Sequence, residues 1–268
     1  MKLAKRNNKL PIIIALTVAL VAVGMFLYWR QLNSAEPTRP EARVETHQSE
    51  VEPDKTMIEL PNTKPIVAIE GEYTEDSHLW RLVNKSHPLD DINYRPEIAK
   101  PNVPTRTDKS LDEQSVRKDI APAVEELFSS AKEAGYDLQI GSGFRSAAQQ
   151  KIYYDNYSRL YGQAAADTFS TKPGYSEHQT GLVVDVSETN NNCYLEECFG
   201  DTEAGKWLAD NAHKHGFILR YPENKDGITD FRYEPWHFRY VGKDLATALY
   251  ESGLTLDEAA PYLEKAVK

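Results

Sequence analysis

Residues 175–185 of this chain read YSEHQTGLVVD. His178 and Asp185 are seven residues apart in this stretch, and an apolar Leu-Val-Val run leads directly into the aspartate. Such a run is typical of a buried strand. An acid beside a buried strand loses its hydration and needs a partner, and a metal ion would supply one. The stretch therefore predicts a strand that presents a metal ligand.

A second motif, EPWHFRY at residues 234–240, adds another histidine and another acid. Glu234 stands three residues before His237, beside an aromatic segment that also indicates a strand. Two histidines and one carboxylate, with a spare glutamate nearby, suit a catalytic zinc ion with an open position for water. An isolated Glu-x-x-His is often a surface pair, so the interpretation rests on its combination with His178 and Asp185.

Together, the two motifs resemble those of the zinc D,D- and L,D-carboxypeptidases and dipeptidases that trim peptidoglycan stem peptides. The pattern is most similar to the VanY-like D-alanyl-D-alanine carboxypeptidases found with vancomycin resistance. The resemblance extends from Leu82, through the segment GSGFRS at residues 141–146, to Gly242. The family usually has alanine at the position of Val183, so a larger side chain behind the metal would narrow the pocket.

The resemblance implies roles for the residues of both motifs. It implies that His178, Asp185 and His237 bind Zn2+, and that Glu234 is the catalytic acid/base. Such a carboxylate accepts a proton from the attacking water and passes it to the leaving amine. Arg145 follows a turn bracketed by glycines, which can bring a guanidinium to the floor of the site to stabilise the oxyanion. The alternative for Arg145 is a structural ion pair with a local acid.

Four further residues are candidate substrate contacts. Gln150 matches a polar position of the family, while Tyr175 and Ser176 precede the first ligand and can reach the terminal carboxylate of the substrate. A capping or packing role is the alternative for these three. Trp236 is expected to pack in the core, with a place in the wall of the pocket as the alternative.

The remaining histidines and the cysteines have simpler interpretations. His213 and His215 fall at a predicted helix end, where a cationic side chain interacts favourably with the helix dipole. Cys193 and Cys198 are the two cysteines of the chain. In an exported protein they are expected to form a local disulfide that stiffens one wall of the substrate cleft. Zinc binding by this pair is the alternative.

The N-terminal region predicts a membrane anchor. Basic residues in the tail 1–9 precede an uncharged, largely apolar run at 10–29, long enough to span a bilayer with its N-terminal end in the cytoplasm. A cleaved signal peptide is the alternative, although its apolar run is usually shorter. Residues 30–75 are rich in Pro, Glu, Thr and Ser and predict a disordered spacer, with a short edge strand at 66–69 as an alternative.

The domain at 76–268 is expected to be α+β. Prolines punctuate an extended segment that wraps the domain, and a helical pattern from Val116 to Ala131 contains Pro122, which should kink or restart the helix. A second helix is predicted at 147–161, with Ile152, Tyr153 and Tyr157 on one face. Further elements are helix 203–215, two C-terminal helices, and strands at 138–140, 182–185, 217–219 and 236–241. This order favours an antiparallel sheet with flanking helices and a zinc site of the hedgehog/DD-peptidase type.

Charge and motifs together define the candidate functions. The net charge of −10 leaves no basic surface for nucleic acid. The leading hypothesis is a single-pass membrane protein whose extracytoplasmic domain removes the C-terminal D-alanine from peptidoglycan stem peptides. The alternatives are a D-Ala-D-Ala dipeptidase and a non-catalytic, zinc-stabilised cell-wall-binding module. The motifs do not distinguish D,D- from L,D-specificity.

Overall fold

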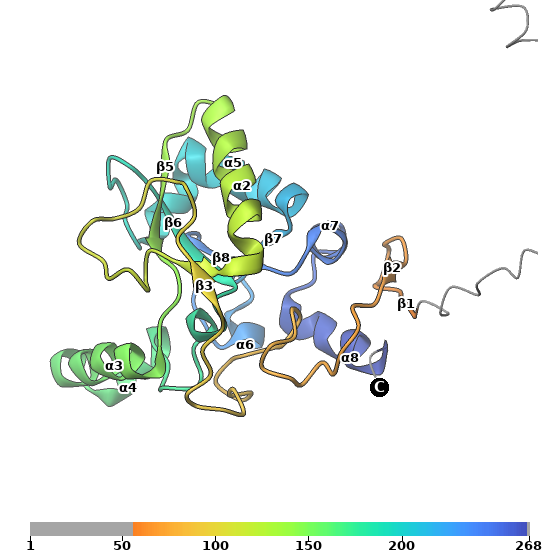
Figure 1. Ribbon diagram of the computed structural model, residues 1–268, viewed down its shortest axis with the longest axis horizontal. Coiled ribbons are helices and arrows are strands. Elements are labelled where there is room, and N and C mark those ends of the chain that lie inside the picture. Colours follow the sequence, from red (N-terminus) through yellow and green to blue (C-terminus); the bar gives the residue numbers. More distant parts are fainter. Residues whose placement is uncertain (1–55, 267–268) are drawn as a thin grey trace, which may run out of the picture. The chain divides into compact units, whose positions relative to one another are not determined.

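In the computed structural model, which describes residues 56–266, the two motifs lie on neighbouring strands of one sheet (Figure 1). All three strand pairings in this four-stranded sheet are antiparallel. The strand order is β5 (Leu138–Ser142), β6 (Val183–Glu188), β8 (His237–Tyr240) and β7 (Phe217–Leu219). The predicted α+β class and antiparallel sheet are confirmed.

The alternation of side chains along the two central strands separates the core from the site. Val184 and Val186 of β6 pack in the main core with Phe238 of β8. Successive residues of a strand point to opposite faces, so Asp185 and His237 lie on the other face. The register pairs Asp185 directly with His237. One apolar–polar pattern thus fixes the core and brings two candidate ligands together.

Two helices cover the core face of the sheet. These are α2 (Ala121–Glu133) and α5 (Glu203–Asn211), and their apolar residues belong to the same core cluster as β5, β6 and β8. The prediction that Pro122 restarts the helix is confirmed, because α2 begins at Ala121 with the proline in its first turn. The residues just before it form β4 (Val116–Arg117), which pairs with β3 (Ile98–Ala99), and the 3₁₀ helix η1 (Lys118–Ile120).

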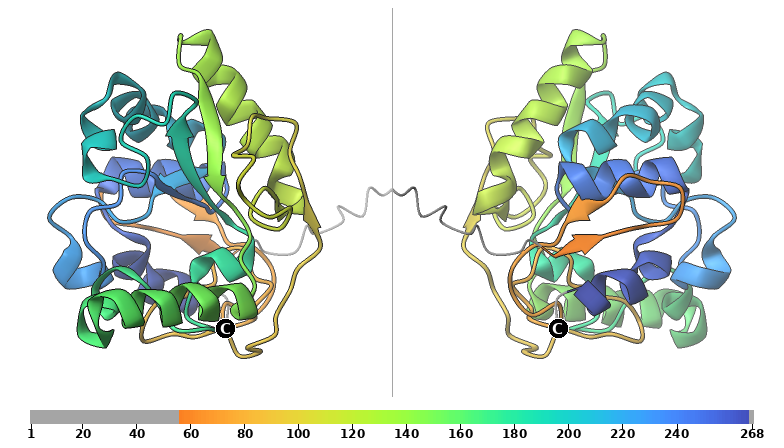
Figure 2. Two further views of the ribbon diagram at one scale, coloured as in Figure 1. Left: turned by 90° about the vertical axis from the view of Figure 1, so that its left-hand side faces the viewer. Right: turned by 90° about the vertical axis from the view of Figure 1, so that its right-hand side faces the viewer.

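A second core lies between a short hairpin and the C-terminal helices (Figure 2). The hairpin is formed by β1 (Met57–Ile58) and β2 (Ile66–Val67), and the helices are α7 (Lys243–Ser252) and α8 (Leu256–Ala266). The predicted spacer at 30–75 is therefore wrong for its last part, where the alternative of a short strand holds. Its spaced apolar residues are buried against these helices despite the polar average composition: Ile58, Leu60, Ile66 and Tyr73.

A helical pair extends beside the sheet (Figure 1) and consists of α3 (Ala147–Tyr161) and α4 (Gln163–Phe169). The predicted bounds of α3 are confirmed, but the predicted face is wrong. Gln150 and Tyr154 are buried, whereas Ile152 is 53% exposed. Gln150 is buried because it forms hydrogen bonds with Arg145 and Thr171 at the edge of the site. These tertiary contacts, and not the apolar residues of the helix, decide which face of α3 is buried.

The remaining elements are short: η2 (Glu177–Thr180), η3 (Glu197–Asp201), η4 (Ala212–His215) and α6 (Asp226–Thr229). The predicted helix 203–215 is thus an α-helix that continues as a 3₁₀ turn and ends before Gly216, whose φ is +87°. No helix within residues 56–266 combines the length and apolar character needed to cross a membrane. The predicted anchor at 10–29 lies outside the described residues.

Gly143 directly follows β5, and both its N–H and its carbonyl oxygen form hydrogen bonds. Its N–H donates to the Glu113 carbonyl at 2.6 Å, and its carbonyl oxygen accepts from His178 Nδ1 at 2.7 Å. A Cβ at this position would overlap the carbonyl oxygen of Ser115. The close approach of two backbone segments therefore requires glycine.

We expect Gly143→Ala to lower the free energy of unfolding by about 1–3 kcal/mol, because backbone must move to admit the methyl group. In thermal unfolding this corresponds to a melting temperature lower by roughly 2–10 °C. Gly227→Ala is the matched control, since a Cβ there meets nothing within 4 Å. Equal melting temperatures for the two variants would show that the backbone contact at Gly143 is not restrictive.

Candidate metal and catalytic site

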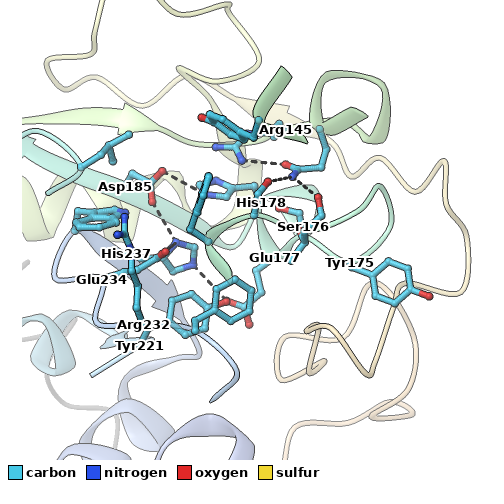
Figure 3. A pocket seen from close by; sticks show the side chains of 18 of the residues that line it. Arg145, Tyr175, Ser176, Glu177, His178, Asp185, Tyr221, Arg232, Glu234 and His237 are labelled. Carbon is cyan, nitrogen blue, oxygen red and sulfur yellow. Dashed lines mark hydrogen bonds and ion pairs between the residues drawn. The ribbon is translucent and has the colours of Figure 1, made fainter. Parts of the chain in front are cut away.

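Three buried side chains form a candidate metal site on the polar face of the sheet (Figure 3). His178 comes from η2, Asp185 from β6 and His237 from β8. One ligand atom from each lies within 4.8 Å of the other two. The structure thus brings together the three residues that the sequence predicted as zinc ligands.

Neighbouring oxygen atoms indicate which nitrogen of each histidine faces the group. His178 Nδ1 lies 2.7 Å from the Gly143 carbonyl oxygen, which can only accept, so this nitrogen carries the proton. Nε2 of His178 is left facing Asp185, at 3.3 Å from Oδ2. His237 has the opposite orientation, with Nε2 3.5 Å from Glu177 Oε2 and Nδ1 3.2 Å from Asp185 Oδ1.

This donor set fits zinc. Two histidine nitrogens and one carboxylate converge, and each histidine directs its other nitrogen to an acceptor that fixes its orientation. Asp185 Oδ1 is buried and forms no hydrogen bond of suitable geometry with a described residue, although His237 Nδ1 lies 3.2 Å away. An unpaired carboxylate oxygen is costly to bury, and a cation between these atoms would compensate it.

Glu177 anchors His237 from behind and was missed as a functional residue. Its Oε1 accepts from Arg220 Nε at 2.8 Å and from Arg239 Nη1 at 2.9 Å, and all three side chains are almost completely buried. Burial alone would raise the pKa of Glu177, but Arg220 and Arg239 lower that pKa well below its usual range. The carboxylate is therefore charged and available to His237. The available sequence signal was the placement of arginines within or directly after apolar strands.

Glu234 lies next to the group. Its Oε2 is 3.7 Å from His237 Nδ1, and its side chain is 10% exposed. Burial raises the pKa of the Glu234 carboxyl to about 7. A carboxyl group with such a pKa can both accept and release a proton near neutral pH, which suits an acid/base.

Arg145 presents a charge that no described carboxylate neutralises. Its Nη1 donates to Gln150 Oε1 and its Nη2 to Ser142 Oγ, each at 3.0 Å, and its guanidinium lies over the Tyr153 ring. The alternative of an ion pair with a local acid is therefore wrong. Gln150 in turn donates to the Thr171 carbonyl at 2.7 Å. With 2% exposure, Gln150 positions Arg145 rather than offering its amide freely to a substrate.

These groups open into a cavity of about 410 Å³. Of the other predicted contacts, Ser176 and Trp236 are buried and line it, and Trp236 also packs in the main core. Tyr175 lines it too, although its ring is directed away from the ligand group (Figure 3). Val183 is fully buried and is not part of the lining. The lining residues that the sequence did not single out are Tyr161, Phe169, Ser170, Thr171, Glu177, Leu195, Tyr221, Phe231 and Arg232.

The cysteine loop forms part of the cavity wall. Cys193 and Cys198 are joined by a disulfide, and Leu195 within this ring lines the cavity. His213 and His215 lie elsewhere. The His213 ring stacks on Tyr250 with 3.8 Å between centroids, and His215 Nδ1 is 3.5 Å from Glu126 Oε1. Neither histidine belongs to the metal group.

Comparisons of the sequence with known proteins agree with this geometry. Residues 113–243 match the family model described as VanY, D-alanyl-D-alanine carboxypeptidase. A putative carboxypeptidase of Bacillus subtilis, YodJ, is 38% identical over 240 residues, which cover 88% of this chain and 86% of the relative. A D-alanyl-D-alanine carboxypeptidase of Enterococcus faecalis is 29% identical over 253 residues, which cover 91% of this chain and 87% of the relative.

Solved structures show the same similarity. The L,D-carboxypeptidase LdcB has 44% sequence identity and a TM-score of 0.63, over 70% of this chain and 86% of that chain. The vancomycin-resistance D,D-pentapeptidase VanY, a mutant solved in complex with Zn(II), has 32% identity and a TM-score of 0.57. That match covers 69% of this chain and 99% of the VanY chain.

We expect His178→Ala, Asp185→Ala and His237→Ala each to purify without zinc, because a site with three protein ligands rarely retains the ion with two. Metal analysis of the purified proteins measures this directly. His213→Ala is the control and should keep the zinc content of the wild type, since it lies outside the group. Near-stoichiometric zinc in all three ligand variants would refute the assignment.

Glu177→Gln should weaken zinc binding by about 10- to 100-fold, because His237 loses the charged partner that orients it. It should also lower the free energy of unfolding by roughly 3–5 kcal/mol, because two buried guanidiniums lose their shared carboxylate. Competition with a chelator measures the affinity and denaturant titration the stability. Glu126→Gln, which removes an exposed partner of Lys243, should leave both near wild type. Unchanged zinc affinity in Glu177→Gln would mean that the network does not support His237.

Proposed function

Because this chain belongs to the VanY family of D-alanyl-D-alanine carboxypeptidases, we propose that it removes the C-terminal D-alanine from peptidoglycan stem peptides. The observation that carries the proposal is the convergence of three groups on one cavity. These are the metal group, the Glu234 carboxyl beside it, and the Arg145 guanidinium without a carboxylate partner. A non-catalytic wall-binding module would need neither Glu234 nor an uncompensated cation.

The chemistry follows from what each residue can do. His178, Asp185 and His237 would hold zinc, which would supply the Lewis acidity that polarises a scissile carbonyl and makes water more acidic. Glu234 accepts the proton of the attacking water and delivers it to the leaving amine of D-alanine. Arg145 donates hydrogen bonds to the negative charge that develops on the carbonyl oxygen. Gln150 and Ser142 hold the guanidinium in place, so little reorganisation is required.

The shape of the cavity favours a peptide over a free dipeptide. The cavity runs from the metal group to aromatic side chains of α3 and α4, among them Tyr157 and Phe169. This length accommodates residues on the amino side of the scissile bond. A dipeptidase acting on D-Ala-D-Ala would need no such extension, and the free dipeptide occurs in the cytoplasm.

For the specificity, we propose L,D cleavage of tetrapeptides as the main activity. The supporting observation is the 44% identity to the L,D-carboxypeptidase LdcB, against 32% to the D,D-pentapeptidase VanY. D,D cleavage of pentapeptides is the second candidate, supported by the D-alanyl-D-alanine carboxypeptidase of E. faecalis among the relatives.

For the location, we propose a single-pass membrane protein with its catalytic domain outside the cytoplasm. Support comes from the basic tail and apolar run at residues 1–29. The disulfide between Cys193 and Cys198 also suits an oxidising compartment. The substrate lies on the same side of the membrane.

The test is incubation of the zinc-loaded protein with defined tri-, tetra- and pentapeptide muropeptides, with and without a chelator. We expect release of D-alanine from the tetrapeptide, loss of activity with the chelator, and recovery when zinc is restored. Glu234→Gln should retain zinc but lose at least about 10²-fold in turnover, because proton transfer is lost. Products are identified by mass spectrometry.

Three results would contradict parts of the proposal. Absence of D-alanine release from both tetra- and pentapeptides would refute the carboxypeptidase. Loss of zinc from Glu234→Gln would make Glu234 a ligand and require another acid/base. Release from the pentapeptide alone would replace L,D by D,D specificity.

A further inference from the structure

The outer end of the cavity is formed by residues for which the proposed catalytic steps have no use. We call this group the outer subsite; it consists of Tyr157, Tyr161, Phe169, Phe231 and Arg232. The first three form an aromatic wall on the α3–α4 pair. The Phe169 ring meets Tyr157 edge-on at 5.2 Å and Tyr161 at 6.0 Å between centroids. Such a wall packs against the aliphatic part of a bound chain.

Arg232 provides the charge of the outer subsite. Its side chain is exposed, its guanidinium carbon lies 6.0 Å from the Phe169 ring centroid, and it forms no ion pair with any carboxylate of residues 56–266. The other arginines of that region pair with carboxylates, apart from Arg145 and Arg159. Arg145 and Arg232 therefore bring to one cavity two guanidiniums that form no ion pair with any carboxylate of residues 56–266, on opposite sides of the ligand group (Figure 3).

The backbone that carries Arg232 is held firmly. The buried Phe231 ring stacks on Tyr221 with 4.4 Å between centroids. Lys85, from the extended segment that wraps the domain, places its Nζ 4.4 Å from the centroid of the Phe231 ring and donates to the Asp230 carbonyl at 2.7 Å. Arg232 is thus presented from a fixed turn, which reduces the entropy that binding must overcome.

The acids near this cavity have other partners. Glu177 is paired with two arginines, Asp185 belongs to the metal group and Glu234 lies beside it. None of them lies within ion-pair distance of Arg232, although the charge of Arg232 acts on Glu234 and lowers the pKa of that carboxyl, against the effect of burial. In a chain of net charge −10, a fixed free guanidinium at the cavity is a specific attraction for an anion.

We propose that the outer subsite binds a free carboxylate on a peptide residue at the amino side of the scissile bond. Arg232 holds the carboxylate with parallel N–H donors, and the aromatic wall covers the adjoining aliphatic chain. Arg232 is then a specificity residue that distinguishes acidic from amidated peptides. The inference rests on the proposed carboxypeptidase function and adds the class of peptide that it prefers.

The experiment uses two stem tetrapeptides of identical sequence. One has free carboxylates at the residues on the amino side of the scissile bond, and the other has primary amides there, with the terminal carboxylate unchanged. We expect kcat/KM of the wild type to be about tenfold higher for the acidic peptide. Arg232→Gln should reduce kcat/KM for the acidic peptide only, so that the ratio falls to about one.

Arg159→Gln is the matched control, because it removes an exposed arginine of α3 that does not line the cavity. It should leave the ratio at the wild-type value. Zinc content and melting temperature of both variants should equal those of the wild type. A ratio near one in the wild type, or an equal loss on both peptides in Arg232→Gln, would refute the subsite.

The subsite and the catalytic function can fail separately. If the wild type cleaves both peptides with no preference, the subsite is wrong and the carboxypeptidase stands. If it cleaves neither, calorimetric binding of the same two peptides still tests Arg232. Tighter binding of the acidic peptide that disappears in Arg232→Gln would support the subsite. Equal binding of the two peptides would overturn it.

Discussion

The Glu177 carboxylate between Arg220 and Arg239 is the interaction on which the site depends. Arg239 also donates to the Leu79 and Arg81 carbonyls, and Arg220 pairs with Asp257 at the start of α8. One buried network therefore ties a metal ligand to the extended N-terminal segment and to the last helix. In a medium of low polarity, loss of one charge leaves the others buried and uncompensated. Removing any one member of the network is therefore expected to destabilise the packing of all these segments.

One face of the sheet contributes to stability and the other carries the candidate site. On one face, Val184, Val186 and Phe238 fill the main core with α2 and α5. On the other face, Asp185 and His237 are cross-strand neighbours, and Arg239 continues the same polar row. A shift of register by one residue would exchange the two faces. Apolar packing thus indirectly specifies the distance between the ligands.

The sequence sufficed for the features encoded by local pattern. The antiparallel sheet and the bounds of α3 could be predicted from period, and the convergence of His178, Asp185 and His237 was expected from the resemblance to the carboxypeptidase family. The partners of Glu177 could not, because Arg220 and Arg239 are distant in sequence and their burial depends on the complete fold. The exposure of Ile152 and the first strand of the hairpin at 57–67 were missed for the same reason, since tertiary contacts decide which apolar side chains are buried. Arg232 carries no local signal at all.

The position of the β1–β2 hairpin has a mechanical consequence. The hairpin packs mainly on α7 and α8 in the second core, to which the sheet contributes Ile218 of its edge strand β7, whereas Asp185 and His237 lie on the strands β6 and β8. Tension applied through the preceding chain would therefore load the hairpin and the C-terminal helices first. The hairpin would peel away before the strands of the site were strained, and the metal ligands would keep their spacing under a pull that detaches the first ordered turn of the domain.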